Sequence, residues 1–480
     1  MGKWRKQTGF AALVALCLAG AAGCGGKRTA DLVFPDPPPP DNLYDTSVLD
    51  RESVWTINNA HDPSIIKTDK GYYVFSTDVH VGGPVRPGLM VRKSPDLIRW
   101  QWVGYALDGV PPEAEAWTGA EGLWAPDVEQ RAGQYRLYYA ASAFGTNRSY
   151  IGLETSTDIE GPWMDQGKVI ATQSGDAPNA IDPNVVTDAN GNPWLAYGSF
   201  FGGIYITPLD PATGKPKQPG FGTRIAARAH ATEQGAVEGP YIIYQPKLKK
   251  YYLFVSYDSL FSDYNVRVGR SDSITGPYVD SLGRTMTDTS FLPQGAIGNK
   301  ILGGYKFSTG EGWVAPGHNS VLRDGDNYYL VHHARGETDK NWPYLHVRKL
   351  LWTADGWPVV SPERYAGETE QPIPKRLIPG NWERIVQAKA IDGQASSYPL
   401  AVKPDGTFAS DVLGHGTWTF DGDHAMTMTW LDKAGKVRET ETVLLLASWD
   451  WENNRPTLVF TGLNPDGEAI WGKKIDPIRK

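Results

Sequence analysis

The stretch Ala60-His61-Asp62-Pro63-Ser64-Ile65-Ile66 places a carboxylate and a proline directly before a short apolar run. Related stretches begin at residues 124, 181, 237 and 316, and each leads into a segment rich in β-branched or aromatic residues. Three of the five copies carry an acid, and the last carries a histidine that we take as equivalent; these residues are Asp62, Asp182, Glu238 and His318. A repeated unit with acids at one place predicts strands arranged around an axis, with the acids aimed at a common point.

Each copy is followed by further short β-like segments that are separated by turn residues. In the fourth unit these segments are 251–257 and 266–271, and the first unit repeats the pattern over 71–77 and 89–94. Five such four-stranded units predict a five-bladed β-propeller over residues 51–367. The first strand of each blade lies nearest the axis of a propeller, so the acids should face its central cleft.

The pattern changes after about residue 361, where prolines at 372, 374 and 379 mark a linker. Clean alternation over 418–430, and apolar runs at 443–446 and 457–460, predict further strands. We expect a small antiparallel β-barrel or β-sandwich over 376–480, and the overall class is therefore all-β. The aromatic residues of this region either bind sugar from an exposed face or fill a core, and we favour the core.

The first residues are typical of a targeting segment. Lys3 and Arg5 precede an apolar run over 10–19 that is too short to span a membrane comfortably. Ala21-Ala22-Gly23-Cys24 resembles a bacterial lipobox, which predicts a lipoprotein-type signal peptide over 1–24 and lipidation of Cys24. The alternative is ordinary cleavage with an incidental cysteine. The protein is therefore expected to be exported, as an envelope lipoprotein at the outer membrane or cell surface, or otherwise secreted.

Residues 25–50 contain the proline-dense, acidic run 35–41 and are expected to form a semi-rigid linker. Such a spacer would hold the folded body away from a membrane, and the lipid anchor would be its only contact with that membrane. The formal net charge of −7 argues against a nucleic-acid partner, which would need a basic surface. The 18 Trp and 23 Tyr fit a neutral, hydroxyl-rich ligand such as a carbohydrate.

Three acids at the starts of repeated units indicate general acid–base chemistry. Hydrolysis of a glycosidic bond needs one protonated carboxyl and one ionised carboxylate. Packing acids together separates their pKa values, so that one of them stays protonated near neutral pH. A single Asp-Pro pair would be explained as a turn or a strand cap, but recurrence at one place in the repeat favours a site.

Taken in order, these stretches resemble glycoside hydrolase family 43, and within it the endo-α-1,5-L-arabinanases. The resemblance is carried by residues 60–64, 123–127, 142–153, 180–185, 197–204, 237–241 and 264–271. It covers roughly residues 50 to 365, and the ordered set is far more specific than Asp-Pro-Ser alone. The C-terminal region resembles the lipocalin-like domain found on the longer arabinanases.

The resemblance implies an inverting enzyme in which Asp62 is the general base and Glu238 the general acid. Asp182 would raise the pKa of the acid and orient it. Inversion implies carboxyl groups about 6.5–9.5 Å apart, which leaves room for water. The family also implies substrate-binding roles: stacking for Trp124 and Phe144, hydrogen bonding for Gly145, Asn179 and Ser199, and sugar contact for Phe200. Phe201 departs from the tryptophan that often follows this phenylalanine in the family.

By the same resemblance, His318 would bind a central ion, usually calcium, whose shell is mostly water. Calcium prefers oxygen ligands, so a structural, hydrogen-bonded histidine is the alternative. The implied substrate is arabinan or its oligosaccharides. An exo-acting arabinofuranosidase or β-xylosidase of the same family is a second possibility, and a non-catalytic surface glycan-binding protein is a third. The intact set Asp62, Asp182 and Glu238 argues against the third.

Overall fold

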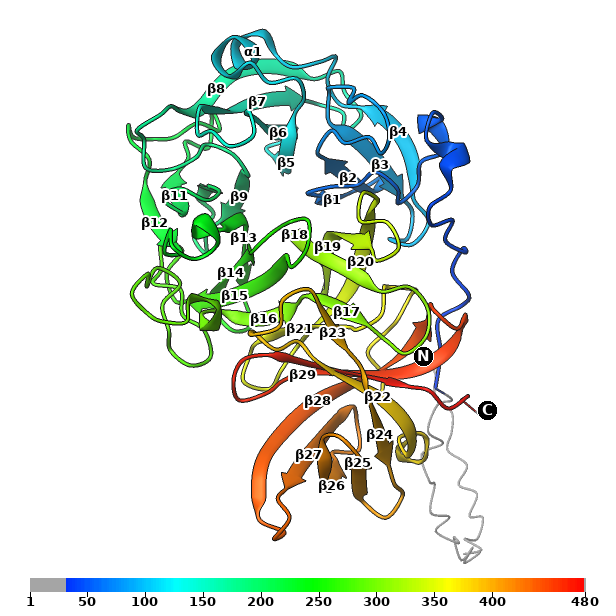
Figure 1. Ribbon diagram of the computed structural model, residues 1–480. Coiled ribbons are helices and arrows are strands. Elements are labelled where there is room, and N and C mark those ends of the chain that lie inside the picture. Colours follow the sequence, from blue (N-terminus) through cyan, green and yellow to red (C-terminus); the bar gives the residue numbers. More distant parts are fainter. Residues whose placement is uncertain (1–31, 479–480) are drawn as a thin grey trace, which may run out of the picture. The chain divides into compact units, whose positions relative to one another are not determined.

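The computed structural model describes residues 32–478, so the signal peptide and Cys24 lie outside the described residues. In Figure 1 the sheets follow one another around a common centre, and the later part of the chain forms a barrel. The prediction of a five-bladed propeller followed by a β-barrel is confirmed. Among the described residues one α-helix is found, α1 (Pro112–Thr118), and none of their helices is long and apolar enough to cross a membrane.

The first three blades are antiparallel meanders in which neighbours in sequence are neighbours in the sheet. Blade 1 consists of β1 (Ser64–Thr68), β2 (Gly71–Ser76), β3 (Met90–Ser94) and β4 (Gln101–Tyr105). Blade 2 consists of β5 (Trp124–Arg131), β6 (Gln134–Ala141), β7 (Ser149–Ser156) and β8 (Met164–Thr172). Blade 3 consists of β9 (Asn184–Thr187), β10 (Pro193–Tyr197), β11 (Ile204–Pro208) and β12 (Thr223–Ala226).

Blade 4 has the same form, with β13 (Val237–Gln245), β14 (Lys250–Tyr257), β15 (Asn265–Ser271) and β16 (Asn299–Leu302). Blade 5 is built on β18 (Trp313–Asp324), β19 (Asn327–Gly336), β20 (Pro343–Trp352) and β21 (Pro358–Val360). The first strands β1, β5, β9, β13 and β18 contact one another in ring order, and β18 closes the ring against β1. The strand that follows each repeated motif is therefore the innermost strand of its blade.

Blade 5 carries two strands that the repeat did not predict. β17 (Gly304–Lys306) pairs with β18, and β23 (Gln394–Ser396) pairs in parallel with β17. Because β23 comes from the region after residue 380, the C-terminal part of the chain extends a sheet of the propeller. The two parts of the chain are thus joined by backbone hydrogen bonding as well as by side chains.

The barrel is a closed antiparallel sheet of eight strands. Its strands are β22 (Gly380–Val386), β24 (Tyr398–Val402), β25 (Thr407–Ser410), β26 (Gly414–Phe420), β27 (Ala425–Leu431), β28 (Val437–Asp450), β29 (Arg455–Leu463) and β30 (Ala469–Lys474). The aromatic side chains Trp382, Trp418, Trp430 and Phe460 are buried inside it. This agrees with the expectation that aromatics fill the core of this domain.

The proline-rich segment lies against the folded body. Leu32 and Phe34 pack against the barrel core, and the backbone of Val33 exchanges two hydrogen bonds with the Gln371 side chain. These contacts cover apolar surface and satisfy backbone polar groups, and both effects stabilise the docked segment. We call residues 32–58 the N-terminal strap.

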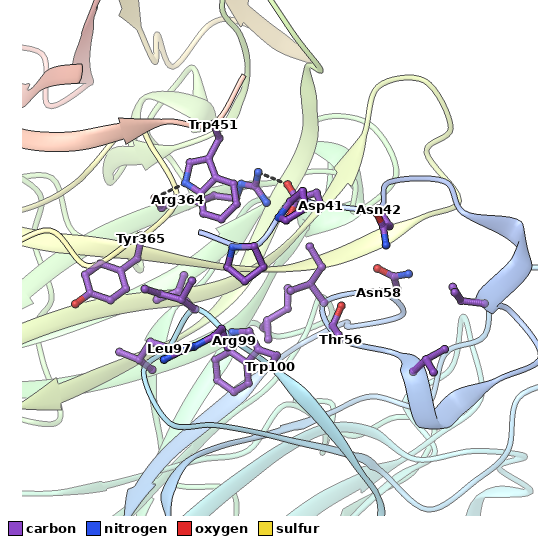
Figure 2. Close-up of a pocket in the computed structure, with 18 residues that line it drawn as sticks. Asp41, Asn42, Thr56, Asn58, Leu97, Arg99, Trp100, Arg364, Tyr365 and Trp451 are labelled. Atoms are coloured by element: carbon purple, nitrogen blue, oxygen red, sulfur yellow. Dashed lines mark hydrogen bonds and ion pairs between the residues drawn. The ribbon is translucent and has the colours of Figure 1, made fainter. Parts of the chain in front are cut away.

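The strap also reaches the propeller, where Asp41 forms an ion pair with the buried Arg364. The Arg364 guanidinium lies 3.9 Å from the ring centre of Trp451, a barrel residue (Figure 2). A cavity of about 250 Å³ lies beneath this part of the strap and is bordered by Leu97, Trp100 and Tyr365. The strap therefore contacts the first blade, the last blade and the barrel.

Candidate active site

The two aspartates of the repeat lie two residues before the inner strands of their blades. Asp62 precedes β1 and Asp182 precedes β9, and each is followed by proline. Both backbones are left-handed, with φ of 51° for Asp62 and 57° for Asp182. This conformation is unfavourable for a residue with a Cβ, and strain of this kind is tolerated mainly where function requires a fixed geometry.

Glu238 and His318 do not occupy the same position in their blades as Asp62 and Asp182, so the assumed equivalence is wrong. Glu238 is the second residue of β13, and the left-handed residue before proline in that blade is Gly239, with φ of 58°. In blade 5 the corresponding residue is Ala315, and His318 lies three residues further along β18. Bulges in β13 and β18 change the direction of the side chains, so Glu238 and His318 still reach the centre.

Both oxygens of the Asp62 carboxylate are engaged. Oδ2 accepts a hydrogen bond from Thr77 Oγ1 at 2.6 Å, while Oδ1 lies 2.8 Å from His61 Nδ1 and 3.1 Å from His318 Nδ1. Burial alone would raise the pKa of Asp62, but the His318 and His61 imidazoles outweigh it and hold that pKa well below its usual range. A carboxylate offers about four acceptor positions, so one remains to accept a proton from water.

Glu238 is held by two hydroxyl groups. Tyr264 donates to Oε1 at 2.7 Å, and Ser199 Oγ lies 2.7 Å from Oε2. Burial and the charge of Glu238 raise the pKa of Tyr264 well above its usual value, so this phenol remains a donor. Ser199 can donate or accept, so the arrangement suits both the protonated and the ionised carboxyl, with the proton carried on Oε2.

Asp182 and His318 complete the cluster. Burial raises the pKa of Asp182 to about 7; His318 opposes this shift, and the charges of Glu238 and Asp62 add to it. The opposite holds for His318, where burial lowers the pKa but the carboxylates of Asp62 and Asp182 raise it to about 9. Asp182 Oδ2 also accepts the backbone N–H of Gly239 at 3.1 Å, next to Glu238. The structure thus brings all three acids and His318 into one electrostatically coupled site.

Two observations bear on a metal ion at this site. Ligand atoms of His61, Asp62 and His333 lie within 4.8 Å of one another, a spacing that could hold an ion, but His333 Nδ1 accepts the Asp62 backbone N–H at 3.2 Å. His318 presents Nδ1 to a carboxylate, the arrangement usual for a histidine whose other ring nitrogen binds a metal. Asn319, the next residue of β18, is buried with neither side-chain polar atom hydrogen-bonded to the described residues. His318 can therefore offer Nε2 to an ion whose other ligands are mainly water oxygens.

The residues predicted to bind sugar lie on several elements. Trp124 begins β5 and is partly buried, whereas Phe144 lies in the β6–β7 loop with 79% of its side chain exposed; Gly145 follows it with a φ of 78°. Asn179 is buried and accepts a hydrogen bond from Ser149. Phe200, partly buried, has a left-handed backbone and follows Ser199. Ser199 itself contacts the acid, so the structure places it as a partner of Glu238.

Several residues of the site were not predicted from the sequence. They are His61, Thr77, Tyr264, His333 and Arg335. His61 precedes Asp62 directly, and Tyr264 begins one of the stretches that carry the family resemblance, so these two offered a signal. Thr77 and Arg335 are brought in only by strand pairing and loop packing.

A five-bladed propeller with three acids at the inner ends of its blades defines a carboxylate-dependent glycoside hydrolase. The chain belongs to glycosyl hydrolases family 43, whose model matches residues 54–358, and a C-terminal lipocalin-like domain model matches residues 362–472.

Similar proteins include arabinan-degrading enzymes. An extracellular endo-α-(1→5)-L-arabinanase of Thermotoga petrophila is 34% identical, with 88% of this chain and 94% of that protein covered. A crystal structure of the endo-1,5-α-L-arabinanase from Thermotoga petrophila matches with a TM-score of 0.77 and 33% identity over 88% of this chain and 99% of the other. An extracellular exo-α-(1→5)-L-arabinofuranosidase of Cellvibrio japonicus is 33% identical, with 63% of this chain and 86% of that protein covered.

Proposed function

We propose that this protein is an inverting endo-α-1,5-L-arabinanase. The observation that carries the proposal is the pairing of an ionised Asp62 with a hydroxyl-held Glu238 in one cluster at the centre of the propeller. The similarity to the Thermotoga petrophila endo-arabinanase over most of both chains supports the substrate and the endo mode.

In the proposed reaction, Asp62 acts as general base. It takes a proton from a water molecule as the water oxygen attacks the anomeric carbon of an arabinofuranosyl unit. The bond from that carbon to the leaving oxygen breaks, and Glu238 donates its proton to this oxygen. The products are two shorter chains, one with an inverted anomeric centre, and the proton taken by Asp62 returns to Glu238 through solvent.

Asp182 modulates the acid in this proposal. Its carboxylate neighbours the Glu238 backbone through Gly239, and a negative charge there makes loss of the Glu238 proton less favourable. Ser199 and Tyr264 position the acid. Trp124, Phe144 and Phe200 are proposed as sugar-stacking surfaces, and Gly145 and Asn179 as hydrogen-bonding partners of the substrate.

A calcium or similar ion is proposed as a resident group, held by His318 through Nε2 together with water. Bound there, a divalent cation would supply positive charge beneath the carboxylates and favour their ionised forms. Metal analysis of purified protein, with His318→Ala as comparison, tests this assignment.

The second candidate is an exo-acting arabinofuranosidase, favoured by the similarity to the Cellvibrio japonicus enzyme over the propeller. Product size separates the two modes on linear, debranched arabinan. An endo enzyme releases oligomers first, whereas an exo enzyme releases one short product from the beginning. Chromatography of early time points is the measurement, and xylan serves as the substrate control for β-xylosidase activity.

Glu238→Gln tests the catalytic assignment itself. The variant removes the proton donor with little change in shape, and kcat on linear arabinan should fall by about 10²–10⁴-fold. Glu115→Gln, at an exposed site on α1, is the matched control and should hydrolyse like the parent. A Glu238→Gln protein that is as active as the parent would overturn the role of Glu238.

Export is proposed from the targeting segment and from the relatives named as extracellular. Lipidation of Cys24 is part of the same proposal. Mass spectrometry of the mature N-terminus distinguishes an acylated Cys24 from an unmodified cleavage product.

A further inference from the structure

Arg335 lies at the end of β19 with 6% of its surface exposed, and each of its side-chain nitrogens has a partner. Nε donates to the carbonyl of Leu260 at 2.9 Å, and Nη1 donates to that of Lys340 at 2.8 Å. Nη2 lies 3.0 Å from Nε2 of His61. The guanidinium is thus fixed by two loops and directed at a single imidazole nitrogen.

This contact determines the protonation of His61. A guanidinium has only donors, so Nε2 of His61 must be the acceptor and carries no hydrogen. The imidazole proton is then on Nδ1, which faces Asp62 Oδ1 at 2.8 Å. With Nε2 occupied as an acceptor, the N–H of His61 is directed at the carboxylate. Asp62 therefore always meets a donor on this side.

The imidazole is also held in its plane. His61 stacks on His333 with ring centres 3.8 Å apart, and His333 Nδ1 accepts the backbone N–H of Asp62. His333 is fully buried, and burial lowers its pKa well below the usual value, so it stays neutral and acts as an acceptor. His333 therefore fixes both the ring of His61 and the backbone of Asp62.

We infer that Arg335 is a positioning residue for the reaction, which acts through His61 by fixing the Nδ1–H tautomer that orients the Asp62 carboxylate. The assignment rests on the proposed role of Asp62 as general base for its effect on the rate, but the tautomer itself is independent of any substrate. A flipped tautomer would place an unprotonated nitrogen against the carboxylate, and the two lone pairs would repel. Asp62 would then turn away from the water that it must activate.

The first measurement is the tautomer of His61 in the resting, full-length protein. Long-range proton–nitrogen NMR of protein with ¹⁵N-labelled histidine distinguishes a protonated Nδ1 from a protonated Nε2, and the chain has only 9 His. His61→Asn assigns the signal by its loss. We expect Nδ1–H in the parent. In Arg335→Gln, whose amide can also accept, and in Arg335→Met, which offers no donor, we expect protonated Nε2 to appear.

The second measurement is steady-state kinetics on linear arabinan. In Arg335→Gln and Arg335→Met, kcat should fall by about tenfold or more while KM changes little. Arg335→Lys, a donor without acceptor capacity, should keep the Nδ1–H tautomer and restore much of kcat. Arg323→Met, at an exposed arginine of β18, is the control and should match the parent in both measurements.

The outcomes separate the possibilities. Nε2–H in the parent, or an unchanged tautomer and kcat in Arg335→Gln, would overturn the inference. The protein could also show an Nδ1–H tautomer that depends on Arg335 and yet leave arabinan intact. That result would support the inference about His61 and refute the proposed function. If Arg335→Met does not fold, the Gln and Lys variants, which keep polar atoms for the two loop carbonyls, decide the question.

Discussion

At the scale of the residue, each catalytic group is held from two sides. The Thr77 hydroxyl and the His61 imidazole hold opposite oxygens of Asp62, and Tyr264 and Ser199 do the same for Glu238. Groups that are fixed before the substrate arrives need no reorganisation during the reaction. This preorganisation accounts for a large part of the electrostatic stabilisation of transition states. Loss of one such contact should therefore reduce kcat without unfolding the protein.

Tyr264→Phe tests this for the acid. The ring and its packing remain, while the hydrogen bond to Glu238 Oε1 is lost, so kcat should fall by about 10–100-fold with KM little changed. Tyr257→Phe is the matched control, because the Tyr257 hydroxyl is buried without a hydrogen-bond partner among the described residues. If both variants behave alike, Tyr264 has no special role.

Asp182→Asn tests the modulation of the acid. Asp182, whose pKa is raised to about 7, is ionised above that pH and then places a negative charge near Glu238. Removing this charge makes deprotonation of Glu238 easier, so the alkaline limb of the kcat/KM profile should move to lower pH by about one unit. Asp326→Asn, at an exposed surface pair, should leave the profile unchanged. An alkaline limb at the same pH in Asp182→Asn and the parent would contradict the modulating role of Asp182.

At the scale of the element, the blade starts show what could be predicted and what could not. The pattern around Asp62 and Asp182 predicted the inner strands, because an aspartate–proline pair before an apolar run marks a strand entry. The positions of Glu238 and His318 within their strands depend on bulges, which leave no clear pattern in one sequence. Arg335 lay in an ordinary strand pattern, and only loop packing brings it to His61.

The strap shows a second limit of what amino-acid composition can predict. Its prolines predicted an extended segment, which the structure shows, but not the surfaces against which the segment lies. Docking depends on contacts far away in sequence. Leu32 and Phe34 pack on the barrel core, the Val33 backbone bonds to Gln371, and Asp41 pairs with Arg364. A single segment therefore contributes to the packing of both the propeller and the barrel.

Phe34→Ala tests the strap as a structural element. Phe34 is partly buried against the barrel core, and its removal should lower the free energy of unfolding by about 1–2 kcal/mol. Val33→Ala changes a neighbouring side chain that is 65% exposed and should have no measurable effect. Denaturant unfolding of the two variants is the measurement. Equal free energies of unfolding for the two variants would mean that the packing of Phe34 does not stabilise the fold.

At the scale of the whole molecule, a buried charge cluster ties the barrel to the segment that follows the last propeller strand. Lys473 of β30 lies 3.0 Å from Glu363, 3.3 Å from Asp450 and 2.6 Å from Glu452. The three acids are close enough for a metal ion, but the Lys473 ammonium occupies the position between them. Burial, with the nearby Glu452 charge, raises the pKa of Glu363 to about 8.

This cluster predicts a pH-dependent stability. A folded-state pKa of about 8 exceeds the ordinary value for glutamate, so Glu363 holds a proton in the folded protein that the unfolded chain releases. The stabilisation that protonated Glu363 gives the folded state is complete below about pH 4.5 and is lost as the pH rises through about 8. The melting temperature of the parent should therefore fall across this window by more than that of Glu363→Gln, which is always neutral. Glu121→Gln, at an exposed site, should follow the parent, and a parallel fall in Glu363→Gln would contradict the assignment.

The most direct test of the central proposal is the configuration of the first product. Proton NMR during the hydrolysis of linear α-1,5-arabinan shows which anomer forms before mutarotation. With Asp62 activating water across the ring from Glu238, the newly formed reducing end should appear first as the β-anomer. Initial release of the α-anomer would require attack by a protein carboxylate and would contradict the pairing of Asp62 as base with Glu238 as acid.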